Sequence, residues 1–153
     1  MKVAVLTVSD RRSRGEEPDE GGPLCADLAR EIGGEVVETA IVPDERDAIA
    51  KALAAWCDAG AADLILTTGG TGLGPRDVTP EATRAVIERE APGLAEAMRA
   101  AGMKLTPYAA LSRHVCGTRG STLIVNLPGA PKAIRECFDG LREILPHAVE
   151  MMR

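Results

Sequence analysis

Residues Leu64 to Pro75 have the sequence LILTTGGTGLGP, and this stretch decides the fold class. The first part, 64–68, is apolar or β-branched and predicts a short buried strand. It runs directly into four glycines within the six positions 69–74. A helix is expected next, because Thr79 is a good N-cap and Pro80 a good first helical residue. A strand, a glycine-rich turn and a helix in this order are typical of an α/β sheet.

The same alternation extends along the rest of the chain. The apolar pattern predicts strands at 3–8, 35–42 and 64–68, and helices at 23–32, 46–59, 79–90 and 93–102. A polar loop is expected over 11–22. A short β-hairpin is expected from 115–118 and 122–127, and one final helix from the stripe Ile134, Phe138, Leu141 and Leu145. We therefore predict a three-layer α/β/α sandwich with a mostly parallel sheet, formed by 1–153 as a single domain.

Composition excludes several classes of function. The chain has 153 residues, a formal net charge of -5 and a pI of about 5.1, which argues against a nucleic-acid partner because phosphates need a basic face. No apolar stretch approaches the roughly 18 residues that a membrane span needs, and no signal peptide is evident, so we expect no membrane partner and a cytoplasmic location. The four cysteines form no Cys-x-x-Cys pair and are expected to be small buried hydrophobes.

Polar and small residues follow each predicted parallel strand. In open α/β sheets the ligand binds at the carboxyl ends of the strands, so these residues are expected to lie along one edge. The strand ends carry Ser9 and Asp10, then Asp44, then Thr68 to Gly72, and finally Asn126, Pro128 and Gly129.

The loop Gly69 to Gly74 supports two interpretations. Glycines permit positive φ and a close ligand approach, and consecutive amide N–H groups next to a helix N-terminus can bind an anion. This favours a phosphate cradle, while the alternative is a plain turn between strand and helix. The loop is not a Walker A motif, because no Gly-Lys-Ser/Thr follows, and its spacing does not fit Gly-x-Gly-x-x-Gly.

Two aspartates beside this loop predict a metal. A carboxylate next to bound phosphates would repel them unless a cation lay between, so Asp77 and Asp44 are candidate Mg²⁺ ligands. Each has an alternative role as a helix-capping group. Glu81 is most simply an acid in the first turn of a helix.

Three polar residues precede the hairpin. Arg113 is either a bidentate phosphate clamp or a surface arginine, and Ser112 either donates a hydrogen bond to a ligand or caps a turn. His114 near Cys116 raises the possibility of a Cys–His nucleophile, but no third orienting group is evident.

These segments together resemble the MogA/MoaB-type molybdenum cofactor biosynthesis proteins. The resemblance rests on Thr68-Gly69-Gly70-Thr71-Gly72 followed by Asp77-Val78-Thr79-Pro80-Glu81-Ala82. Further agreement comes from Ser9-Asp10-Arg11, Val42-Pro43-Asp44-Glu45, Leu111-Ser112-Arg113 and Asn126-Leu127-Pro128-Gly129. It covers nearly the whole chain in order, and it implies the molybdopterin-binding domain fold.

The resemblance also implies an activity. Members of the MogA-like branch transfer AMP from ATP to molybdopterin with Mg²⁺, releasing pyrophosphate ahead of metal insertion. The family's functional acids match Asp44 and Asp77, and a pterin-site position matches Ser112. The expected substrate-binding residues are Ser9, Asp10, Thr68, Gly69, Gly70, Thr71, Gly72, Thr79, Pro80, Glu81, Ser112, Arg113, Asn126, Pro128 and Gly129.

Partners and alternatives follow from the same resemblance. It implies a homotrimer and a MoeA-type insertase as partner. Two other functions remain open: a carrier that holds molybdopterin without transforming it, and a nucleotide-binding regulatory or assembly protein. The sequence does not distinguish a molybdenum from a tungsten pathway.

Overall fold

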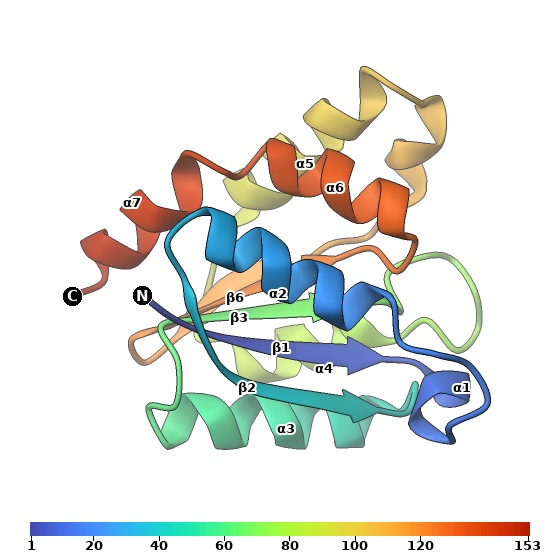
Figure 1. The fold of residues 1–153 in the computed structure, drawn as a ribbon, viewed down its shortest axis with the longest axis horizontal. Coiled ribbons are helices and arrows are strands. Elements are labelled where there is room, and N and C mark those ends of the chain that lie inside the picture. The colour runs from blue at the N-terminus through green and yellow to red at the C-terminus, as the bar shows by residue number, and fades with distance from the viewer.

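The computed structural model describes residues 1–153 and contains one six-stranded sheet between two layers of helices (Figure 1). The strand order is β2-β1-β3-β6-β5-β4. The strands are β1 Lys2–Val8, β2 Glu35–Val42, β3 Leu64–Thr68, β4 Arg89–Glu90, β5 Cys116–Arg119 and β6 Thr122–Leu127. The first four in this order are parallel, while β5 runs antiparallel to both β6 and β4. The expected α/β fold with a mostly parallel sheet is thus confirmed.

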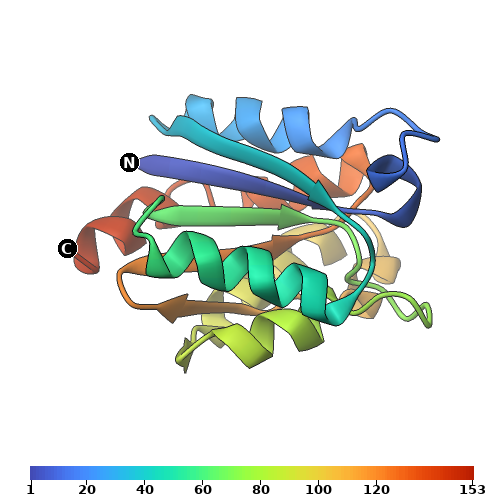
Figure 2. The same ribbon diagram turned by 90° about the horizontal axis from the view of Figure 1, so that it is seen from below.

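The helices bury apolar faces on both sides of this sheet. They are α1 Asp10–Ser13, α2 Gly21–Glu31, α3 Arg46–Asp58, α4 Thr79–Val86, α5 Pro92–Met103, the 3₁₀ helix η1 Pro107–Leu111, α6 Pro131–Asp139 and α7 Ile144–Met151. The core on one face joins α2, α5, α6 and α7, with Phe138 and Met98 fully buried. On the other face, α3 and α4 lie side by side against the sheet (Figure 2), and the core beneath them contains Leu53 and Val86. The predicted three layers are therefore present.

The N-terminal loop is shorter than expected. The polar composition of 11–22 predicts no helix, but Ser9 accepts a hydrogen bond from the Arg12 amide at 3.2 Å and caps the single turn α1. Helix α2 then begins at Gly21 rather than at Pro23. Tight packing explains the two glycines there: a Cβ at Gly22 would lie 2.6 Å from Thr7 Oγ1.

Two helices end earlier than predicted. Helix α4 stops at Val86 because the next residues join the sheet, where Glu88 N–H donates to the Thr118 carbonyl at 2.8 Å. The predicted single C-terminal helix is divided into α6 and α7. At the division, a Cβ on Gly140 would lie 2.9 Å from Ala101 Cβ, so the close approach of α5 to this point requires a glycine. Sheet pairing and helix packing both depend on distant partners, which the local pattern does not contain.

None of the helices is both long enough and apolar enough to cross a membrane.

Candidate functional site

The glycine loop after β3 presents its amide groups outward. The N–H groups of Gly70, Thr71 and Gly72 donate to no acceptor in the protein. The loop carbonyls, in contrast, accept from protein donors: Gly69 from Thr79 Oγ1 at 2.9 Å, Gly70 from the Thr79 amide at 3.1 Å, and Thr71 from the Arg113 amide at 2.8 Å. A loop with its carbonyls satisfied and three successive N–H groups free is a preformed anion-binding concavity.

Glycine is required at two positions of this loop. Gly69 and Gly70 have φ of 100° and 70°, a region that other residues rarely adopt. A Cβ on Gly69 would also collide with the Val8 carbonyl oxygen, and one on Gly70 would collide with Thr79 Oγ1. The loop is therefore packed against β1 and α4, and its conformation is fixed before any ligand binds.

Thr79 has a different role from the predicted one. It was expected to be the N-cap of the helix, but Val78 occupies that position and no side chain caps it. The Thr79 hydroxyl instead donates to the Gly69 carbonyl from a fully buried position. The residue thus connects the start of α4 to the loop.

Arg113 also holds the loop. Its Nε donates to the Gly72 carbonyl at 2.8 Å and its Nη2 to the Asp77 carbonyl at 2.7 Å. Both guanidinium Nη atoms donate to Glu81, at 2.6 and 3.2 Å. These bonds lower the pKa of Glu81 and raise that of Arg113. One interpretation of Arg113 was a bidentate phosphate clamp. In this structure its guanidinium group instead donates its hydrogen bonds to Glu81 and to the loop.

Two acids flank the loop, and each keeps one carboxylate oxygen free. Asp44 Oδ2 accepts from the Asp10 amide at 2.9 Å, and Asp77 Oδ2 accepts from the Gly74 amide at 2.9 Å. Neither Oδ1 atom has a hydrogen bond, and a Cβ on Gly70 would lie 3.2 Å from Asp44 Oδ1. Burial, together with the charges of Asp10 and Asp77, raises the pKa of Asp44.

The donor set fits Mg²⁺ shared with a ligand. No group of three or more His, Cys, Asp and Glu residues that could hold a metal by themselves is present. Mg²⁺ is usually held in proteins by one or two carboxylates together with substrate phosphates and waters. Asp44 and Asp77 offer two free oxygens, and a cation would offset the cost of burial that, with the nearby charges of Asp10 and Asp77, raises the pKa of Asp44.

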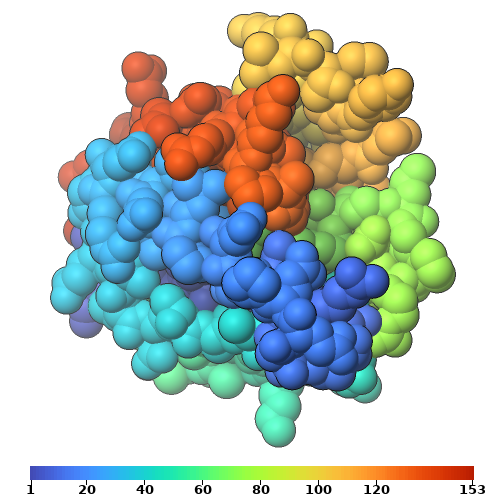
Figure 3. Space-filling view, turned by 45° about the vertical axis from the view of Figure 1, so that its right-hand side comes forward, coloured from blue at the N-terminus to red at the C-terminus, as the bar shows by residue number.

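The loop forms one end of a cavity of about 470 Å³, a size typical of small-molecule sites. In Figure 3, η1 (yellow to orange) stands out from the body beside α6 and above the green loop. Of the predicted site residues, the cavity is lined by Gly70, Thr71, Gly72, Asp77, Ser112, Pro128 and Gly129.

The other predicted residues lie outside the cavity lining. Asn126 is fully buried, where its amide donates to Thr67 and Thr83 at 3.0 Å each and its oxygen accepts from the Val115 amide. Thr68 donates to the Pro128 carbonyl at 2.7 Å. Their contacts are those of residues that position the strand ends. The remaining predicted residues that do not line the cavity are Ser9, Asp10, Asp44, Gly69, Thr79, Pro80, Glu81 and Arg113.

Sequence analysis missed the far wall of the cavity. This wall comes from α5, η1 and α6 and contains Met98, Arg99, Gly102, Thr106, Tyr108, Ala109, Ala133, Glu136 and Cys137. No local motif marks these residues, because the strand-end rule concerns only the edge of the sheet. The exposure of the apolar residues Leu105, Tyr108 and Leu111, which would have drawn attention to this wall, becomes evident only in the structure.

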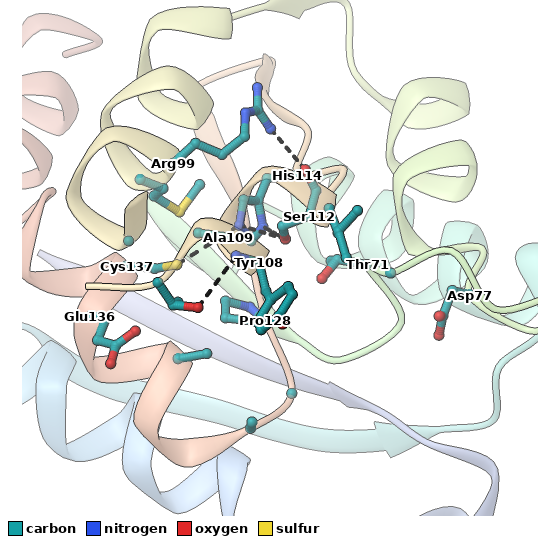
Figure 4. A pocket seen from close by; sticks show the side chains of 18 of the residues that line it. Thr71, Asp77, Arg99, Tyr108, Ala109, Ser112, His114, Pro128, Glu136 and Cys137 are labelled. Atoms are coloured by element: carbon teal, nitrogen blue, oxygen red, sulfur yellow. Dashed lines mark hydrogen bonds between the residues drawn. The ribbon is translucent and has the colours of Figure 1, made fainter. Parts of the chain in front are cut away.

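Ser112 and His114 lie between the two ends of the cavity (Figure 4). Ser112 Oγ is 2.8 Å from His114 Nε2, and burial together with the Arg99 charge lowers the pKa of His114 to about 4. A general base must become charged during catalysis, which this environment disfavours. The pair therefore suits orientation of the Ser112 hydroxyl rather than activation of a nucleophile.

The cysteines are free and buried, as predicted. His114 contacts Cys137 Sγ at 3.8 Å, and burial raises the pKa of Cys137 to about 11. Cys116, the predicted partner of His114, is fully buried, and burial raises its pKa to about 12. Neither environment favours the thiolate that a Cys–His nucleophile needs.

Comparison with known proteins agrees with this geometry. A family model described as "Probable molybdopterin binding domain" matches residues 4–147. A molybdopterin adenylyltransferase of Helicobacter pylori (strain J99) is 43% identical, over 99% of this chain and 88% of that protein. The Drosophila melanogaster protein "Molybdenum cofactor synthesis protein cinnamon" is 48% identical over 99% of this chain, which spans only 26% of the fly protein.

Structural comparison gives the same relationship. The crystal structure of the molybdopterin biosynthesis enzyme MoaB of Thermus thermophilus superposes with a TM-score of 0.93 and 50% identity, covering 99% of this chain and 95% of that one. Fold and site together define an α/β domain with a cavity of small-molecule size at the carboxyl edge of its sheet. The chain belongs to the molybdopterin-binding domain family that includes MogA and MoaB.

Proposed function

We propose that this chain, acting over 1–153 as a single domain, transfers AMP from ATP to molybdopterin and releases pyrophosphate. The observation that carries the proposal is the loop after β3, where three successive amide N–H groups have no partner in the protein and two neighbouring carboxylates, of which Asp77 lines the cavity, have free oxygens. Amides suit phosphate oxygens, and the carboxylates suit a bridging cation. Relatives named molybdopterin adenylyltransferase, at 41–44% identity, support the same reaction.

The proposed reaction needs position and charge rather than a protein nucleophile. An oxygen of the terminal phosphate of molybdopterin forms a bond to the α-phosphorus of ATP. The bond from that phosphorus to the oxygen leading to the β-phosphorus breaks, and pyrophosphate leaves with the electron pair. The amides of Gly70, Thr71 and Gly72 would hold one phosphate group in line. Their rigidity, maintained by Thr79 and Arg113, is a form of electrostatic preorganisation.

Asp44 and Asp77 would hold Mg²⁺ between them and the phosphates. When bound, the ion would neutralise the negative charge that develops on the leaving pyrophosphate. Asp10 supports Asp44 from behind: each backbone amide donates to the other's carboxylate, at 2.9 and 3.0 Å, and Arg76 pairs with Asp10 at 3.0 Å.

The test follows pyrophosphate and adenylylated molybdopterin together in a mixture of protein, molybdopterin, ATP and Mg²⁺. We expect both products in equal amounts. Replacing Asp77 by Ala should reduce turnover at least about 100-fold, because the variant would lose a ligand of the metal that stabilises the leaving group. Pterin binding should be largely preserved. Near-normal turnover in that variant would remove its role as a metal ligand.

The alternatives predict different results. A carrier would bind molybdopterin tightly and release no pyrophosphate. A nucleotide-binding regulatory protein would bind ATP with an affinity that molybdopterin does not change, which calorimetry with and without the pterin would measure.

The same proposal extends to assembly and location. We propose a homotrimer that works in the cytoplasm and passes its product to a MoeA-type insertase. Sedimentation would measure the oligomeric state, and a monomer would contradict this part alone.

A further inference from the structure

The cavity contains a half-buried carboxylate that the proposed reaction does not use. Glu136, on α6, lines the cavity, and only 14% of its side chain is exposed. It forms no hydrogen bond within the protein. Its one cationic neighbour is Lys132 Nζ at 4.0 Å, on a side chain that is 91% exposed. Since no donor of the protein reaches this carboxylate, its oxygens are acceptors available to a ligand.

The surroundings of Glu136 are apolar and narrow. Met98 and Gly102 from α5, Ala109 from η1 and Ala133 from α6 line the same part of the site. The contact of α5 with η1 is close, since a Cβ on Gly102 would lie 2.9 Å from Ala109 Cβ. Three of these four residues are small, and the cavity of about 470 Å³ has room for a flat ring system.

Two other polar groups that line the cavity, Arg99 and His114, already have partners in the protein. Arg99 Nη1 donates to the Ser112 carbonyl at 3.1 Å, and the neutral His114 is paired with Ser112. Glu136 is thus the free charged group at this end, while the unpaired hydroxyl of Tyr108 belongs to a side chain that is 76% exposed. Figure 4 shows it across the cavity from Asp77 and Thr71, with Ser112 and His114 between. A ligand whose phosphate lies on the glycine loop would therefore extend its other end towards Glu136.

We propose that Glu136 is a specificity-determining residue that recognises the pterin ring by accepting hydrogen bonds from its 2-amino group and the adjacent ring N3–H. The proposal rests on the proposed function, in which molybdopterin occupies this cavity. Two neighbouring oxygens match two neighbouring donors, and charged acceptors make the stronger hydrogen bonds.

The same geometry disfavours adenine at this end. An adenine edge presents one amino donor beside a ring nitrogen lone pair, so one oxygen of Glu136 would face another acceptor. That mismatch would set one carboxylate oxygen against another acceptor inside the cavity, which is the kind of contact that discriminates between ligands. We therefore assign the end of the cavity around Glu136, called the chamber below, to the pterin ring. ATP is assigned to the remainder of the site.

The test compares pterin with lumazine, which carries a carbonyl oxygen in place of the 2-amino group. Binding of each to the wild-type protein, Glu136→Gln and the control Lys132→Ala is measured by fluorescence titration. We expect the wild-type protein and Lys132→Ala to bind pterin about ten-fold or more tightly than lumazine, and Glu136→Gln to lose that preference. In the adenylylation assay Glu136→Gln should raise KM for molybdopterin about ten-fold with little change in kcat or in KM for ATP.

Other outcomes would overturn the inference. A Glu136→Gln protein that keeps the wild-type preference shows that Glu136 does not recognise the ring. A raised KM for ATP with an unchanged KM for molybdopterin places adenine in the chamber. If the wild-type protein binds neither pterin nor molybdopterin, the proposed function fails as well. Binding of both with no effect of Glu136→Gln would overturn the inference about Glu136 alone.

Discussion

The two ends of the cavity are built in different ways. The loop end is made from backbone: its amides face outward because Thr79 and Arg113 hold its carbonyls. The helical end is made from side chains on α5, η1 and α6, and it is mostly apolar with one free carboxylate, that of Glu136. A backbone site recognises a group common to many ligands, such as phosphate, while a side-chain chamber distinguishes one ring from another. The division suggests that the loop end serves the chemistry and the helical end the choice of substrate.

The largest effect is expected for a methyl group added to the loop. Gly70→Ala places a Cβ in a residue with φ of 70° and against the buried Thr79 Oγ1. Strain of the backbone and overpacking together should lower the unfolding free energy by about 3 kcal/mol. Chemical denaturation measures this, and we expect weaker phosphate binding in the same variant.

Gly120 supplies the matched control. It has a φ of 56° in the turn between β5 and β6, and nothing lies within 4 Å of its Cβ position. Gly120→Ala should therefore lower the unfolding free energy by backbone strain alone, about 1 kcal/mol. Equal losses in the two variants would contradict the claim that the loop is packed in place by α4.

This contrast also explains what sequence can predict. The glycine loop, the two acids and the strand ends were recognisable because each is a local pattern at a position fixed by the α/β fold. The role of Arg113 was not, since its partners Gly72, Asp77 and Glu81 lie 32 to 41 positions away in the sequence. Glu136 resembles any helical surface glutamate until α5 and η1 are placed over it. Contacts between distant elements determine these features, and a single sequence contains no direct record of them.

The next effect concerns the helical end, which should be sensitive to acid. Burial lowers the pKa of His114 from 6.5 to about 4, so the folded protein binds its proton less readily than the unfolded chain. The contribution of His114 to the free energy of unfolding is therefore fully present above pH 6.5 and is lost as the pH drops towards 4. The loss from this residue should reach about 2 kcal/mol by pH 5. His114→Gln should remove that dependence in urea denaturation between pH 7 and 5.

The exposed His147 is the control, because this chain has two histidines. His147→Gln should leave the pH dependence unchanged. If the free energy of unfolding of the wild-type protein did not change between pH 7 and 5, burial would not be keeping the His114 imidazole neutral.

The smallest predicted effect on stability concerns the loop end of the cavity. Its pH dependence has the opposite sign to that predicted for His114. Burial and the nearby carboxylates raise the pKa of Asp44, so the folded protein holds that proton more tightly than the unfolded chain. The ionised form therefore costs stability as the pH rises above the ordinary value of 3.8. Asp44→Asn keeps an oxygen for the Asp10 amide and removes the charge. We expect a slightly higher Tm at pH 7 with loss of adenylylation, and no difference in Tm near pH 3.5.

Asp58→Asn tests whether this gain is specific to the site. Asp58 is paired with Arg119 at 2.9 Å, and that hydrogen bond lowers its pKa, so its charge stabilises the fold and its removal should lower the Tm at pH 7. A lower Tm for Asp44→Asn as well would mean that the Asp44 charge is structural. A higher Tm with lost turnover would mean that the fold tolerates an unfavourable charge at Asp44 because the reaction requires it, as is common where function and stability compete.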